Sequence, residues 1–285
     1  MKIFVAGALG VIGRQLLLKL IETGHEVIGT TRQKERTREI EATGASAVVV
    51  DALDRNNMMS VLATSQPDVV IHQLTALSHR DFAQTSRLRE EGTRNLVDAA
   101  LAAGVKRVIA QSISFAYEPG EVPATEDVPL DVCALVPRKQ LVDAIKTLEF
   151  TVKETPHYVI LRYGAFYGPG TFYANDGFVA HQIRQKQIPA TDAVTSFIHV
   201  NDAASATILA LGWPSGVFNI VDDEPVRGVD WIPAYAEAIG APLPDIRSGR
   251  EGWERGASNR KARQYGWKPA YPTWKSMVVN LHKQS

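Results

Sequence analysis

Short apolar runs alternate with longer amphipathic stretches over the first two thirds of the chain. The apolar runs are rich in β-branched residues and predict strands at 2–7, 25–31, 45–50, 67–72, 106–112 and 157–164. The amphipathic stretches predict helices at 11–23, 33–42, 54–64, 83–103 and 137–154. Apolar strands that alternate with helices are typical of a parallel sheet covered on both faces. The pattern therefore predicts an α/β fold with a doubly wound parallel sheet.

The pattern changes after residue 165. Gly, Pro and aromatic residues become dense there, as in FYGPGTFY (166–173) and WKPAYPTWK (267–275). We therefore predict two domains: a first domain over 1–165, which also takes a strand and a helix from 195–221, and a smaller irregular lobe over 166–285.

Composition narrows the classes of partner. Lys+Arg and Asp+Glu are equal at 31 each among 285 residues, so charge offers no reason to expect nucleic acid or an anionic membrane as partner. The single cysteine, Cys133, excludes an internal disulfide, and the N-terminal run predicts a strand rather than a leader. We expect a cytoplasmic monomer or homodimer that acts on a small molecule. No His, Cys or acidic residues have metal-ligand spacing, so we expect no metal.

The stretch GALGVIG (7–13) joins the first predicted strand to the first predicted helix. Free amides at a helix N-terminus and the helix dipole favour an anion at such a turn. Gly7 allows a tight turn, Gly10 allows close approach of a pyrophosphate, and Gly13 allows close packing of helix and strand. We therefore predict a dinucleotide site.

Several motifs, taken in order, resemble those of the extended short-chain dehydrogenases/reductases, the NAD-dependent epimerase/dehydratase family. They are GALGVIG, DVVIHQLTAL (68–77), EGTRNLVDAALAAGVKRVIAQS (91–112), LRYGAFYGPGT (161–171), SFIHVNDAA (196–204) and KARQYGWKP (261–269). The resemblance implies a dinucleotide-binding Rossmann domain, a C-terminal substrate lobe and a bound nicotinamide cofactor. It also implies that His72 is structural, and His199 fits a structural turn before a helix that begins at Asp202.

The end of the second strand bears on which cofactor is bound. It reads TTRQKER, so Arg32 follows the strand where NAD-binding proteins usually carry an acid for the ribose 2′-hydroxyl. A guanidinium there suits a 2′-phosphate, which favours NADP over NAD. The alternative is a solvated basic patch at the start of the next helix. Asp51 matches the family acid that binds the adenine amino group, or else it caps the following helix, for which Asp54 is better placed. The predicted cofactor-binding residues are Gly7, Leu9, Gly10, Val11, Ile12, Gly13, Arg32, Asp51, Ala52, Leu74 and Lys139.

The expected proton donor is missing. In the family, a YxxxK pair supplies a tyrosine whose pKa the lysine lowers. The segment ALVPRKQLVDA (134–144) aligns with this pair through Lys139, which places Leu135 where the tyrosine belongs. A leucine cannot donate a proton. Either the donor has moved or the protein is not a conventional dehydrogenase.

Other side chains could take over the chemistry. Candidate displaced donors are Tyr117, Tyr163 and Tyr167, each of which could instead be a packing residue. Ser112 and Ser114 are candidate ligands of a substrate oxygen, or they simply end a strand. Lys139 is a candidate ribose ligand, or a surface lysine in the first turn of a helix.

Three functions fit these residues. The first is an NADP(H)-dependent oxidoreductase that acts on a carbonyl or alcohol of a small or medium substrate, with a relocated proton donor. The second is a nucleotide-sugar epimerase or dehydratase that retains NAD(P). The third is a non-catalytic NADP(H)-binding sensor or interaction module, which the leucine at 135 would permit.

Overall fold

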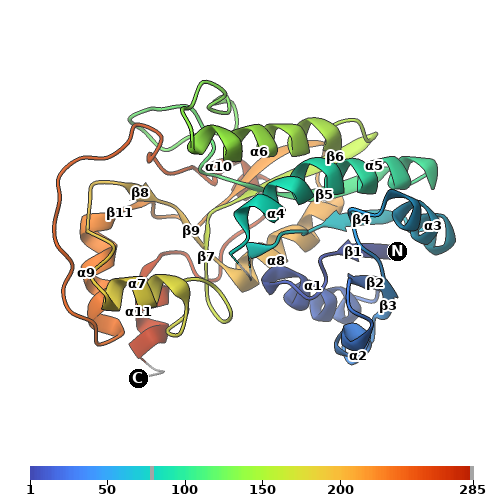
Figure 1. Ribbon diagram of the computed structural model, residues 1–285, viewed down its shortest axis with the longest axis horizontal. Helices are drawn as coiled ribbons and strands as arrows, with labels where there is room; N and C mark the ends of the chain where they lie inside the picture. The colour runs from blue at the N-terminus through green and yellow to red at the C-terminus, as the bar shows by residue number, and fades with distance from the viewer. Residues whose placement is uncertain (78–79, 283–285) are drawn as a thin grey trace. The chain divides into compact units, whose positions relative to one another are not determined.

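A computed structural model describes residues 1–77 and 80–282 (Figure 1). Its central sheet has seven strands in the order β10-β6-β5-β4-β1-β2-β3. The strands are β1 (Lys2–Ala6), β2 (Glu26–Thr31), β3 (Ser46–Val49), β4 (Val69–His72), β5 (Arg107–Ile113), β6 (His157–Tyr163) and β10 (Gly216–Ile220). The registers of β1 with β2 and β4, of β2 with β3, and of β4 with β5 are all parallel. The predicted doubly wound sheet is confirmed, and its strand order reverses between β1 and β4.

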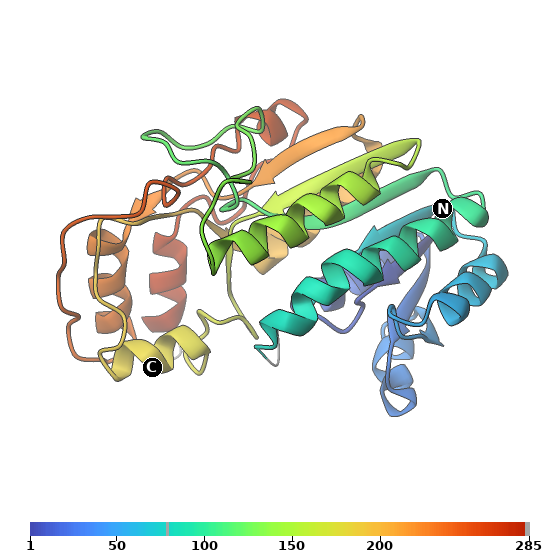
Figure 2. The same cartoon turned by 45° about the horizontal axis from the view of Figure 1, so that its top comes forward.

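Helices cover both faces of this sheet (Figures 1 and 2). They are α1 (Val11–Glu22), α2 (Thr37–Glu41) after the short turn η1 (Lys34–Arg36), α3 (Arg55–Ser65), α4 (Phe82–Arg87), η3 (Leu88–Gly92), α5 (Thr93–Ala102) and α6 (Arg138–Val152). Apolar residues of α3, α5 and α6 form one core with the sheet, including Met58, Leu96 and Leu148. The helices α1 and α2 lie on the other face, where Ile40 of α2 contacts Gly29 of β2.

The predicted helix over 83–103 is continuous in the chain but not uniform in geometry. Between α4 and α5, η3 is a π-helical segment, in which the backbone takes a wider turn. Such segments inside α-helices are frequent at functional sites because they redirect side chains. Here the segment carries the buried residues Leu88, Arg89 and Gly92.

The chain folds as two compact units. Unit 1 comprises 1–112, 132–161 and 204–217, and unit 2 comprises 113–131, 162–203 and 218–285. The remaining elements are β7 (Ala165–Tyr167), α7 (Phe178–Arg184), β8 (Val194–Thr195), β9 (Phe197–His199), α8 (Val200–Leu209), η4 (Ala210–Gly212), β11 (Val226–Arg227), α9 (Gly228–Ala238), α10 (Arg260–Gln264) and α11 (Lys275–His282). Which unit binds cofactor and which binds substrate stays a prediction.

Aromatic side chains form the core of unit 2. Tyr173, Phe197, Trp231 and Tyr235 meet edge to face, with ring centroids 5.1 to 6.4 Å apart. Edge-to-face contact is a preferred geometry for aromatic pairs, so this cluster stabilises a unit whose strands are short.

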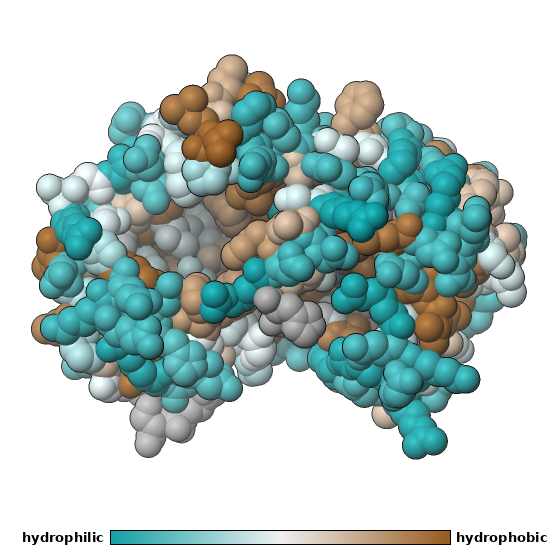
Figure 3. Space-filling model, viewed as in Figure 1, coloured by the Kyte–Doolittle hydropathy of each residue, from teal (hydrophilic) through white to brown (hydrophobic). Residues whose placement is uncertain are grey.

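The outer surface is mostly polar. On the face seen in Figure 3, hydrophilic residues dominate and apolar residues form scattered patches. No helix within the described part of the chain is both long enough and apolar enough to span a bilayer.

Candidate active site

The glycine turn after β1 has the geometry that close approach requires. Gly7 has a φ of +90°, and a Cβ atom there would lie 2.6 Å from the carbonyl oxygen of Gln73. A Cβ atom on Gly13 would lie 2.6 Å from the carbonyl oxygen of Ala8. Gly10, by contrast, is exposed, and a Cβ atom there would meet only the carbonyl oxygen of Gly7, at 3.3 Å. Two glycines are thus needed for packing, while the third leaves the backbone open to a ligand.

Backbone amides gather at this turn. The amide of Gly10 donates to the Gly7 carbonyl over 3.1 Å, and the first intrahelical hydrogen bond of α1 runs from Arg14 to Gly10 over 3.0 Å. The amides of Val11, Ile12 and Gly13 therefore have no acceptor within the helix. No described side chain caps α1, and its first turn has no acidic residue. These donors fit a dinucleotide pyrophosphate, so the residues of 7–13 would hold that group.

The basic residues near the end of β2 differ in whether they form ion pairs within the protein. Arg36 and Arg14 both donate hydrogen bonds to the carboxylate of Glu39. These bonds lower the pKa of Glu39 to about 2, and the bond from Arg36 has the larger effect. Arg32 is exposed, and its guanidinium forms no ion pair with any described carboxylate. Thr31 accepts a hydrogen bond from the Gln33 amide, which turns the chain directly after Arg32. Arg32 is therefore a cation directly after β2 that forms no ion pair with the described residues.

In the loop after β3, the residue that caps α3 is not the residue predicted to bind the cofactor. Asp54 is the N-cap of α3 and accepts from the Asn57 amide over 3.0 Å, so capping does not depend on Asp51. Asp51 accepts from the Leu53 amide over 3.0 Å through Oδ1. The carbonyl of Ala52 accepts from the Asn95 side chain of α5, which fixes this loop. Asp51 thus lies in a turn whose conformation these two hydrogen bonds stabilise.

Leu9 and Leu74, two other predicted cofactor contacts, form hydrogen bonds through their backbone atoms. The carbonyl of Leu9 accepts from Nε of Arg14, and the amide of Leu74 donates to Nδ1 of His72. His72 is buried, and its Nε2 shares a 2.8 Å hydrogen bond with Thr93. This placement suits the structural role expected of His72.

The helix α6 carries Lys139, the residue predicted to be the lysine of an incomplete YxxxK pair. Nζ of Lys139 lies 2.9 and 3.1 Å from the two carboxylate oxygens of Asp143, one turn along the helix. Leu135 precedes the helix, and its carbonyl accepts from the Lys139 amide over 2.9 Å. The Leu135 side chain is 84% exposed, so it is not a core residue. Core packing therefore does not account for a leucine at this position, and its alignment with the family tyrosine stays a prediction.

The hydroxyl of Ser112 is hydrogen-bonded within the protein. It donates a 2.7 Å hydrogen bond to Glu149 of α6, and both residues are buried. This bond favours the structural alternative for Ser112, although its proposed contact with substrate stays a prediction.

Unit 2 holds the other predicted catalytic residues. The Tyr117 hydroxyl donates to Asn219 over 2.6 Å, and the Arg162 guanidinium lies 4.8 Å from the Tyr117 ring centre. Burial raises the pKa of Tyr117 to about 12, which makes it a weak acid. Tyr163 is buried with its ring tilted against Phe166, 5.2 Å between centroids.

Ser114 and Tyr167 complete the predicted set. The Ser114 amide donates to the Tyr163 carbonyl over 2.9 Å, whereas the Ser114 hydroxyl bonds to no described group. The Tyr167 ring is buried and meets the ring of His199 edge to face at 5.1 Å. Of these hydroxyls, that of Ser114 is the uncommitted one.

Several buried ionisable groups were not anticipated from the sequence, and Arg89 and Asp222 are two of them. Arg89 is 5% exposed, and Asp222 is 1% exposed with its Oδ2 atom unbonded. Desolvation, with smaller effects from the charges of Asp223 and Glu224, raises the pKa of Asp222 to about 8. A sequence signal exists for Arg89, because it occupies an apolar-face position between Thr85 and Leu96 on the predicted helix.

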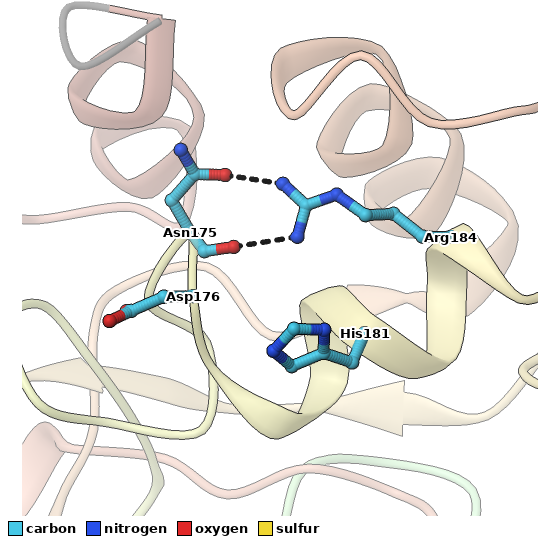
Figure 4. Close-up of a pocket in the computed structure, with 4 residues that line it drawn as sticks. All are labelled: Asn175, Asp176, His181 and Arg184. Atoms are coloured by element: carbon cyan, nitrogen blue, oxygen red, sulfur yellow. Dashed lines mark hydrogen bonds between the residues drawn. The ribbon is translucent and has the colours of Figure 1, made fainter.

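Surface pockets do not gather the predicted residues. One pocket in unit 2 is lined by Asn175, Asp176, His181 and Arg184 (Figure 4). Arg184 points toward Asn175 and donates to its backbone oxygen over 2.8 Å and to its side-chain oxygen over 2.7 Å. Since these bonds satisfy the arginine within the protein, the pocket offers no free cation.

A Rossmann sheet with a glycine turn at its strand-order reversal defines a dinucleotide-binding protein of the dehydrogenase type. The family model for the NAD dependent epimerase/dehydratase family matches residues 3–220. The chain belongs to this family, which confirms the resemblance seen in its motifs.

Known proteins extend the comparison. A "3-diazoavenalumate denitrifying reductase" from a Streptomyces species is 42% identical over 302 residues, covering 96% of this chain and 98% of the relative. A UDP-glucose 4-epimerase of Halalkalibacterium halodurans is 26% identical over 327 residues, covering 100% of this chain and 96% of the relative.

Solved structures show the same fold. The UDP-glucose 4-epimerase of Thermotoga maritima, solved with UDP-glucose, has a TM-score of 0.78 at 23% identity and covers 100% of this chain and 99% of its own. The Bordetella bronchiseptica enzyme WbmG in complex with NAD has a TM-score of 0.78 at 22% identity, covering 100% and 94%.

Proposed function

We propose that this protein is an NAD(P)H-dependent reductase that removes an aryl diazonium group, the cationic form of a diazo substituent, from an organic acid and releases dinitrogen. The observation that carries the proposal is the 42% identity, over 96% of this chain, to a "3-diazoavenalumate denitrifying reductase". The predicted alignment of Leu135 with the family tyrosine supports it, because hydride transfer to a diazonium group needs no proton donor.

The reaction balances without an added proton. A dihydronicotinamide held by the predicted cofactor-binding residues would supply hydride, so that R–N₂⁺ + NAD(P)H would give R–H + N₂ + NAD(P)⁺. The carbon–nitrogen bond breaks, a carbon–hydrogen bond forms, and the positive charge moves from the diazonium group to the nicotinamide. Reduction of a carbonyl, by contrast, leaves an oxyanion that must be protonated. An apolar Leu135 is compatible with the first reaction and unsuited to the second.

The residues take the following proposed roles. The amides of 7–13 hold the pyrophosphate, and Arg32 pairs with a 2′-phosphate, which favours NADP over NAD. Lys139 binds the ribose, its charge balanced by Asp143. The loop residues Asp51, Ala52 and Leu74 contact the rest of the cofactor, and Ser114 positions the substrate.

The test is a stoichiometry. Purified protein would be mixed with NADPH and a ¹⁵N-labelled aromatic diazo acid, with gas evolution followed by mass spectrometry. One mole of labelled dinitrogen per mole of NADPH oxidised supports the proposal. Cofactor binding without any dinitrogen, or steady turnover of simple carbonyl compounds instead, would overturn it and return attention to a relocated donor such as Tyr163.

A nucleotide-sugar epimerase or dehydratase is the second candidate. Full-length similarity to UDP-glucose 4-epimerases at 26% identity favours it. It requires NAD(P) that stays bound through purification and measurable binding of a UDP-sugar. A protein that binds cofactor but shows neither turnover nor UDP-sugar binding would instead be a sensor or interaction module.

A further inference from the structure

A buried cation lies on the helix that spans α4, η3 and α5. Arg89 is only 5% exposed and belongs to the π-helical segment η3, against which α6 packs. Two other arginines on this helix, unlike Arg89, form ion pairs with glutamates. Arg87 is exposed and pairs with Glu91 over 3.0 Å, and Arg94 pairs with Glu154 over 2.8 Å.

Arg89 has no such counter-charge. Across the described ranges 1–77 and 80–282, no carboxylate lies within 4.0 Å of its guanidinium and no group accepts a hydrogen bond from it. Burial lowers the pKa of Arg89 to about 10, so it stays protonated at neutral pH. A largely buried guanidinium without a protein acceptor is unfavourable, because its donors have lost much of their hydration and gained no acceptor in exchange. The nitrogen atoms of Arg89 are not completely sealed from solvent, so a ligand can reach them.

Contacts of His72 show where this cation lies. Nε2 of His72 shares a 2.8 Å hydrogen bond with Thr93, which comes one helical turn after Arg89. The charge of Arg89 contributes, after the larger effect of burial, to lowering the pKa of His72 to about 4. His72 is the last residue of β4 and pairs in register with Ala6, the last residue of β1. The glycine turn begins at the next residue, Gly7. Arg89 therefore lies beside the carboxyl end of β4, at the edge where the strand order reverses.

We propose that Arg89 binds an oxyanion at this edge of unit 1, either a phosphate of the dinucleotide or a carboxylate of the substrate. The guanidinium presents paired donors that match either group in a bidentate manner. Arg89 is a buried residue of the π-helical segment, and the ligand supplies the acceptor that the protein does not. This inference does not depend on the diazo chemistry proposed above.

Three substitutions test the site: Arg89→Met, which keeps length but removes charge; Arg89→Lys, which keeps charge but not the paired donors; and Arg87→Met as an exposed control on the same helix. Thermal unfolding is measured without ligand and with inorganic pyrophosphate, and NADPH is titrated by fluorescence. Cinnamate and its uncharged methyl ester are titrated by calorimetry with NADP⁺ saturating.

The expected result is that Arg89→Met unfolds at the same or a higher temperature than wild type without ligand, since an unpaired charge is removed. Pyrophosphate raises the unfolding temperature of wild type and of Arg87→Met more than that of Arg89→Met, which keeps only the backbone amides of 7–13 as donors. A loss of NADPH affinity of about tenfold or more identifies the cofactor phosphate as the ligand, and Arg89→Lys falls between the two. Unchanged NADPH affinity with loss of cinnamate but not ester binding identifies a substrate carboxylate.

Two outcomes overturn the proposal. One is an Arg89→Met protein that binds pyrophosphate, NADPH and cinnamate as wild type does. The other is a ligand-free Arg89→Met protein that unfolds several degrees below wild type or fails to fold while Arg89→Lys folds normally, because the charge would then be part of the scaffold. The readouts use binding and unfolding alone, so absence of dinitrogen release would reject the proposed function without touching this site.

Discussion

The hydroxyl of Ser112 on β5 donates a 2.7 Å hydrogen bond to the carboxylate of Glu149 on α6, and both side chains are buried. Ser112 stands where a substrate ligand was expected, yet its proton is directed into unit 1. Ser114, two residues on, keeps an uncommitted hydroxyl.

Ser112→Ala is expected to destabilise the protein by about 1–3 kcal/mol, because it removes a donor from a buried carboxylate. Chemical denaturation with a linear extrapolation measures this. Ser60→Ala, on the exposed side of α3, is the control and is expected to change stability by less than about 0.5 kcal/mol. Equal stability of the two variants would contradict the structural role of Ser112.

Arg32→Ala is expected to raise the KM for NADPH about tenfold or more and to leave that for NADH nearly unchanged, since a charge-assisted bond to the 2′-phosphate is lost. Steady-state kinetics with both cofactors measures the ratio. Arg36→Ala is the control, because its guanidinium is already held by Glu39. If Arg32→Ala weakens both cofactors equally, the arginine does not read the 2′-phosphate.

Leu135→Tyr and Leu135→Phe form a matched pair that tests the need for a proton donor. Leu135 is 84% exposed, so both variants are expected to fold. Rates of dinitrogen release for the two are expected to agree within about threefold, because hydride transfer to a diazonium group needs no acid. A tyrosine variant that is tenfold faster than the phenylalanine variant, with a new pH dependence, would show that a proton donor is required.

Asp222→Asn tests a pH dependence of stability. The folded-state pKa of Asp222, about 8, lies above the ordinary value of 3.8, so the folded protein holds an extra proton between these values. Wild type is therefore expected to lose stability as pH rises from about 4 to about 8 through this group. The asparagine variant lacks that loss and is expected to be more stable than wild type at pH 9 by about 1–3 kcal/mol. Denaturation curves at pH 5 and pH 9 measure the difference, and identical slopes would contradict the buried proton.

The sheet and its first helices could be predicted because their signals are local. The strand at 2–7 and the helix at 11–23 are observed as β1 and α1 within a residue of each predicted end. The glycine turn between them follows from the same few residues, since the φ of Gly7 and the contact at Gly13 are set within the βα unit.

Other features depend on contacts between distant segments, and sequence periodicity cannot report these. The helix predicted over 83–103 contains a π-helical segment, and the burial of Arg89 there involves packing of α6 from 138–152. The bond from Ser112 to Glu149 links residues 37 positions apart. Ser112 and Ser114 are therefore equivalent in sequence and different in structure.

The bond between Tyr117 and Asn219 limits how the 113–131 segment can vary. The Asn219 side chain also donates to the carbonyls of Ala124 and Ser258, so one amide joins three stretches of unit 2. The 113–131 segment could be exchanged for that of a relative in order to alter which compounds are accepted. Such an exchange would succeed only if the new segment keeps a tyrosine at 117, or if residue 219 is replaced together with the segment.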